Sequence, residues 1–246
     1  MTLAADLLLL AIDPERLTVR ASAKIGYSLM GADLVELTIA RRVDVVDGRI
    51  GVVDTRPTGD RCLDAALASI VSRSRPPRAK TWVSAQRRDL RDDYIGVLEE
   101  QHAISTERRR ALGLFTVSRY RVLDVQRQAE IRARVTAIAH GKQPASPRER
   151  ALAGLTWSCG LASALLPGAE NREARKHLEQ IARGRDDRDS VDAVVRATRG
   201  ATDAAVRAST DAAIDAAIHA AIHASVDAAH HAAAGGHDAG AGGGHH

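Results

Sequence analysis

The sequence predicts a mainly α protein: a single globular helical domain with two short β-hairpins, followed by an Ala/His-rich tail. Aromatic residues are scarce and Phe115 is the only phenylalanine, so Leu, Ile, Val and Ala must build the core, as they do in packed helices. Apolar residues recur at helical spacing, and only two segments carry paired β-rich runs. Beyond Gly200 the composition changes to Ala, His, Asp and Gly. We therefore expect a domain over 1–199 and a tail over 200–246 that is partly helical and then disordered.

The elements follow from local signals taken in order. The segment "LLLLAIDPERLTV" predicts a short helix or strand, an Asp-Pro turn and an extended piece. Asp47-Gly48, between two β-rich runs, is a strong signal for a tight hairpin. Asp60 is placed to cap the next helix, which "SRPPR" ends. The segment "LGLFTVSRYRV" favours a second strand pair. The remaining predicted helices lie at 26–40, 85–101, 126–139, 146–166, 169–184 and 190–200.

The clearest helix start is at Ser146, where Pro147 and Glu149 complete the pattern of a capping box. This helix is expected to run to Leu166. Its uncharged stretch, 151–169, approaches the length of a membrane span, but its Thr, Ser and Gly residues favour a buried core helix. The N-terminus has Asp6 and no basic residue before its apolar run, which does not fit a secretory signal. Any membrane association is therefore expected to be peripheral.

The positive charge of the chain is almost all arginine. Lys and Arg outnumber Asp and Glu by 35 to 31, a mild excess that is compatible with an anionic partner and that also follows from a GC-rich genome. The stretch "QRRDLRDD", residues 86–93, concentrates both signs. On a helix, Arg88 and Arg91 fall on one side and the aspartates on the other. The alternative is a solvated helix turn in which Arg88 pairs with Asp92, worth roughly 0.2 to 0.5 kcal/mol.

Three longer segments carry a family resemblance: "LMGADLVELTIARRVDVVDGRI", "PTGDRCLDAAL" and "ISTERRRALGLFTVSRY". In this order, over roughly residues 5 to 198, they resemble the Golgi phosphoprotein 3 family, which has bacterial members and binds phosphatidylinositol 4-phosphate. The resemblance implies a peripheral membrane adaptor without catalytic activity, and a homo-oligomer formed through the hairpin near 109–122. Leu112, Leu114 and Phe115 are the candidate apolar contacts of that hairpin, with burial in the domain's own core as the alternative.

The resemblance also implies a lipid headgroup site. The two arginines of the family that lie three residues apart fall on Arg88 and Arg91. The tryptophan and arginine of the other half fall on Ala21 and Met30, so that half is missing. Nearby cations could contribute to the site: Arg87, Lys24 and Arg20. Each cation near an anionic surface contributes about 1 kcal/mol, so binding by one domain is weak and dimerisation would raise it.

Other function classes are less well supported. The sequence contains no nucleophile elbow, phosphate-binding glycine loop or metal-ligand pattern, so we expect no enzyme, cofactor or metal. Cys62 and Cys159 are expected to be buried thiols of a cytoplasmic protein at the cytosolic face of a membrane.

Two alternatives remain. A winged-helix regulator would contact nucleic acid through Arg41, Arg42 and Arg49, although the acidic helix before the hairpin argues against nucleic acid. A dimeric scaffold would have lost lipid binding. In the tail, His219 and His223 could share a helix face, but repeat expansion explains them better.

Overall fold

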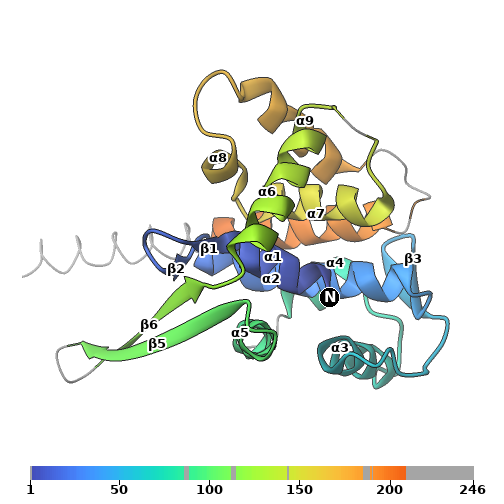
Figure 1. Cartoon of the computed structure of the whole chain (residues 1–246). Coiled ribbons are helices and arrows are strands. Elements are labelled where there is room, and N and C mark those ends of the chain that lie inside the picture. Colours follow the sequence, from blue (N-terminus) through green and yellow to red (C-terminus); the bar gives the residue numbers. More distant parts are fainter. Residues whose placement is uncertain are drawn as a thin grey trace, which may run out of the picture. The chain divides into compact units, whose positions relative to one another are not determined.

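The computed structural model describes residues 2–85, 89–111, 115–142, 144–184, 189 and 191–208. The chain divides into two compact units, 1–203 and 204–246. The first unit is mainly α, as predicted (Figure 1). Its elements are α1 (Leu3–Ala11), β1 (Ile12–Asp13), β2 (Thr18–Val19), α2 (Ser22–Ile39), β3 (Val43–Val46), β4 (Arg49–Val52), α3 (Arg61–Val71), α4 (Ala79–Ser84), α5 (Leu90–Glu100), β5 (Ile104–Ala111), β6 (Phe115–Val122), α6 (Val125–Ala139), α7 (Pro147–Ser158), α8 (Ala162–Leu165) and α9 (Arg172–Arg183).

Helices α1 and α2 form the centre of the unit. All nine residues of α1 are buried and all except Asp6 are apolar, as expected for a helix at the centre of a domain. Figure 1 shows α6, α7 and α9 on one side of this pair, and α3, α5 and the β5–β6 hairpin on the other. Helix α2 contacts α1, α3, α4, α5 and α7. The core therefore lies around α1 and α2, and the surface sites are carried by the elements that surround them.

The local signals are confirmed where they depend on a few neighbouring residues. Asp47 and Gly48 both have positive φ, 50° and 71°, as the tight turn between β3 and β4 requires. The Asp60 side chain accepts from the backbone N–H groups of Cys62 and Leu63 in the first turn of α3. Ser146 and Glu149 form the capping box at the start of α7. Residues 151–169 lie largely in the core, and no described helix is long and apolar enough to cross a membrane.

Four features differ from the prediction. The helix expected over 146–166 is two helices, because Gly160 adopts φ +83° just after α7 and ends it. The helix expected from residue 85 begins at Leu90, after the separate short helix α4. The extended piece after the Asp-Pro turn pairs with β1 as a third, two-residue ladder. Residues 191–203 are helical to the end of the first unit, beyond the expected stop at 200.

Both cysteines are free and buried. We therefore expect their thiols to react slowly in the folded protein. Burial raises the pKa of the Cys62 thiol from 9.0 to about 11 and that of Cys159 to about 12. Because the thiolate is the reactive form, raising the pKa by two slows reaction at neutral pH about a hundredfold. We expect a disulfide reagent to label neither thiol until the protein unfolds in urea. Labelling of either thiol at the unfolded rate would contradict this burial.

Candidate functional site

The helix expected to carry the headgroup arginines is fixed to the centre of the fold. Leu90, Tyr94 and Leu98 form the buried face of α5, as expected for apolar residues that recur every four positions on a helix. The Tyr94 hydroxyl donates a hydrogen bond to Asp33 Oδ1 on α2, and both side chains are buried. Burial, together with the charge of Asp33, raises the pKa of Tyr94, so the phenol stays protonated as a donor. Helix α5 thus presents its first turn from a rigid position.

Arg91 lies in that first turn. Its side chain is 41% exposed, and its Nε lies 3.5 Å from Asp92 Oδ1, a long and weak contact. The N-cap residue, Asp89, makes no side-chain capping bond to the helix. Arg87 and Arg88 lie outside the described residues, so their place beside Arg91 and the pairing of Arg88 with Asp92 stay predictions. What the structure places is one guanidinium at the surface end of α5.

The positions of the missing half of the site belong to the core. Met30 is buried on α2, and Ala21, with φ 54°, packs partly buried against the core at the start of that helix. Arg20 is engaged elsewhere, since its Nε and Nη2 donate to Asp13 Oδ2 at 3.0 and 2.8 Å. Lys24 lies near Gly160, just beyond the end of α7. These two cations therefore lie at the start of α2, and Arg20 already has a carboxylate partner.

The hairpin expected to mediate self-association projects from the helical body (Figure 1). Its strands, β5 and β6, pair over eight residues from Ile104↔Val122 to Ala111↔Phe115. Its base is joined to the rest of the fold by a bond from Tyr120 N to Leu17 O. Leu112, Leu114 and the side chain of Phe115 lie outside the described residues, so their proposed contact stays a prediction.

The order of these elements agrees with a comparison at the level of families. A sequence model of the family described as Golgi phosphoprotein 3 (GPP34) matches residues 3–205. The chain belongs to this family. A search of curated proteins gave no match. The matched GPP34 region contains every element named above and all of the first unit from residue 3 onward.

The Pro-Thr-Gly-Asp segment of this GPP34 protein has a structural role. Thr58 donates from both its backbone N and its Oγ1 to Asp64 Oδ1, at 2.6 and 2.7 Å. Asp60 N in turn donates to Thr58 Oγ1. Together with the cap from Asp60, these bonds fasten the turn to the first turn of α3. The motif that is most specific in the sequence thus builds a helix start.

The nucleic-acid alternative finds little support in this geometry. Its recognition helix would be α2, whose residues from Leu29 to Val35 are all buried. Arg42 pairs with Asp54 at 2.6 Å, and Arg49 donates to the Pro76 carbonyl oxygen. A helix packed on so many neighbours cannot enter a major groove, which has to be read by exposed side chains.

No group of three or more His, Cys, Asp or Glu side chains that could hold a metal ion occurs in the described part of the chain. His219 and His223 lie outside it.

The structure contains two features that the sequence did not predict. One is an ion-pair network among Asp6, Glu36, Arg127 and Arg148, which joins four helices. The other is a basic pocket beside the β3–β4 hairpin. The run "SRPPR", residues 74–78, predicts only a helix stop, and two residues, Ser72 and Arg73, come directly before it in "SRSRPPR". The three arginines of this longer run, without an acid, were the available signal for the pocket.

Proposed function

We propose that this GPP34 protein is a peripheral membrane adaptor that binds anionic phospholipid headgroups and catalyses no reaction. Membership of the Golgi phosphoprotein 3 family carries the proposal. The exposed guanidinium of Arg91 on the fixed first turn of α5 supports it, because arginine forms bidentate bonds to phosphate. The lipid is of the phosphatidylinositol phosphate type, and the protein works in the cytoplasm at the cytosolic face of a membrane.

The apolar residues in the other half of the site change what the binding can select. With Met30 and Ala21 packed into the core, no side chain at these two positions can donate to a headgroup. Binding then depends on the number of negative charges more than on the stereochemistry of the inositol ring. Arg87, Arg88, Arg91 and Lys24 together supply about 4 kcal/mol, a millimolar-scale affinity for one domain.

Self-association through the β5–β6 hairpin would turn this weak affinity into useful retention. The projecting strands can pair with a second copy along their outer edges, as exposed edge strands do. Two linked sites on one membrane then bind by avidity. Liposome retention should consequently rise more steeply than in proportion to protein concentration, in step with association measured by sedimentation velocity under the same conditions.

Liposome flotation at low salt tests the lipid site. Replacing both Arg88 and Arg91 with alanine should weaken binding to phosphatidylinositol phosphate vesicles about thirtyfold, fivefold for each charge. The matched control is Arg16→Ala with Arg172→Ala, which removes two exposed arginines elsewhere and should change binding little. Equal retention of both double variants would contradict the site. An absence of vesicle binding by the parent chain, with self-association intact, would indicate a dimeric scaffold that has lost lipid binding.

A further inference from the structure

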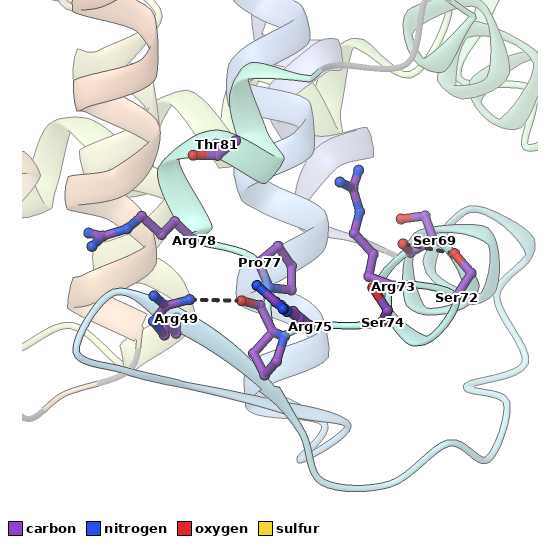
Figure 2. Close-up of a pocket in the computed structure, with 10 residues that line it drawn as sticks. Arg49, Ser69, Ser72, Arg73, Ser74, Arg75, Pro77, Arg78 and Thr81 are labelled. Atoms are coloured by element: carbon purple, nitrogen blue, oxygen red, sulfur yellow. Dashed lines mark hydrogen bonds between the residues drawn. The ribbon is translucent and has the colours of Figure 1, made fainter.

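A pocket of about 770 Å³ opens beside the β3–β4 hairpin, between the end of α3 and the start of α4 (Figure 2). Four arginines line it: Arg49 from β4, Arg73 and Arg75 from the loop after α3, and Arg78 at the N-cap of α4. Figure 1 shows α3 and β3 at the end of the fold that is opposite to the β5–β6 hairpin. The pocket shares no residue with the candidate headgroup site on α5.

The backbone brings these arginines together. The loop before α4 lies against the hairpin, because Ile50 N donates to Pro77 O at 2.9 Å and Ala79 N donates to Gly48 O at 2.8 Å. Arg49 and Arg78 face each other as an antiparallel bridge. Arg49 Nη1 also donates to Pro76 O at 3.2 Å, as the dashed line in Figure 2 shows. Strand-like pairing therefore fixes the backbone at Arg49 and Arg78 without a ligand, and Arg73 and Arg75 precede Arg78 on the same loop.

The charge of the pocket is unbalanced. No acidic side chain lines it among the described residues. Within the residues that the structure describes, the side chains of Arg73, Arg75 and Arg78 make no hydrogen bond or ion pair. Elsewhere in the unit, arginines such as Arg20 and Arg42 have an aspartate within 3 Å. Gathering like charges in one open pocket costs electrostatic free energy, which an anionic ligand would offset.

The remaining donors fit phosphate oxygens. The Ser69 hydroxyl is occupied, since it donates to Ala66 O and accepts from Trp82 Nε1. Ser74 and Thr81 line the pocket with hydroxyls that have no partner among the described residues. Guanidinium forks together with free hydroxyls suit a phosphate group, and the volume is that of a small-molecule site.

We propose that this pocket binds a compact anion that carries two or more phosphate groups. The same chemistry is available from a soluble phosphate ester and from a phospholipid headgroup. Val46, which pairs with Arg49 across the hairpin tip, is 60% exposed and would contact the bilayer in the lipid case. It would have no role in binding a soluble anion.

Calorimetry of the full chain with inorganic pyrophosphate at low salt tests the pocket. Arg73→Gln with Arg75→Gln should weaken binding at least about thirtyfold, while Arg16→Gln with Arg172→Gln should change it less than about twofold. All four side chains are exposed, so urea unfolding should report little change in stability for either double variant. An absence of pyrophosphate binding, or equal loss in both variants, would overturn the proposal, as would binding to duplex DNA alone.

Flotation with phosphatidylinositol phosphate vesicles distinguishes the two sources. If the headgroup is the ligand, Arg73→Gln with Arg75→Gln and also Val46→Thr should reduce vesicle binding. If the ligand is soluble, only pyrophosphate binding should fall, and only in the arginine variant.

Arg91→Ala separates this site from the one on α5, since it should leave pyrophosphate binding unchanged. If Arg91→Ala reduces flotation while the pocket variant keeps its pyrophosphate affinity, the pocket proposal fails and the lipid proposal stands. If instead the pocket variant loses pyrophosphate affinity while Arg91→Ala leaves flotation unchanged, the pocket proposal stands and the lipid site on α5 fails.

Discussion

Replacing Gly31 with alanine should lower the free energy of unfolding of this protein by about 3 kcal/mol. Gly31 lies on α2, where the helical segment 191–203 crosses closely. A Cβ at this position would lie 2.1 Å from Thr198 Oγ1, 2.7 Å from its Cγ2 and 2.9 Å from its Cβ. Thr198 is fully buried, and its hydroxyl is bonded to Val194 O, so it cannot swing away at low cost. The two helices would have to separate.

Urea unfolding of the full chain measures this effect. Gly96→Ala is the matched control, because Gly96 is also inside a helix but an added Cβ would meet only the flexible end of Arg61, at 3.6 Å. That change should be neutral or stabilise by up to about 1 kcal/mol, the helix propensity gain. Thr198→Ala in the Gly31→Ala background should recover part of the loss by removing the two closest atoms. Equal stability of the two glycine variants would show that the helices do not approach this closely.

The close approach at Gly31 illustrates which part of the fold the sequence can predict. Caps and tight turns, such as those at Asp47-Gly48 and Ser146, depend on neighbours within a few residues, so their chemistry is visible in the sequence. Helical spacing shows that Leu29, Leu34 and Leu37 are buried, but not which helix covers the glycine between them. The end of α7 near Gly160 was missed for a related reason, since an apolar run has the same spacing whether it is one helix or two.

In the candidate sites, too, the features that depend on neighbouring residues can be predicted, and those that depend on contacts distant in the sequence cannot. The buried face of α5 follows from helical periodicity and is present in the structure. Arg91 lies partly exposed in the first turn of that helix, and its role in headgroup binding stays a prediction. The basic pocket does not follow, because Arg49 and Arg78 meet only through pairing between a hairpin and a loop that is far away along the chain. No local pattern encodes such pairing. Within the loop, the spacing of arginine, serine and proline is equally typical of a solvated helix stop.

Replacing Arg148 with methionine should lower the free energy of unfolding by about 2 to 3 kcal/mol, the largest expected loss after that of Gly31→Ala. Arg148, on α7, donates from Nε to Glu36 Oε1 at 3.0 Å and from Nη2 to Asp6 Oδ2 at 3.1 Å. The two acids are largely buried, with side chains 15% and 12% exposed. Arg127 on α6 pairs with the other oxygen of Asp6 at 2.6 Å, so the network joins α1, α2, α6 and α7. Methionine keeps most of the stem but removes one of the two positive charges that balance these acids.

The expected loss of unfolding free energy is smaller than the usual cost of breaking a fully buried pair, because the Arg148 side chain is itself 35% exposed. Arg61→Met is the matched control. Arg61 pairs with Glu100 at a similar distance, 2.7 Å, but both side chains are more than half exposed. Its removal should cost less than about 1 kcal/mol, and that cost should vanish in high salt, whereas the cost at Arg148 should persist because buried charges are screened little. A loss at Arg148 as small and as salt-sensitive as the loss at Arg61 would show that water, and not the protein, solvates Asp6 and Glu36.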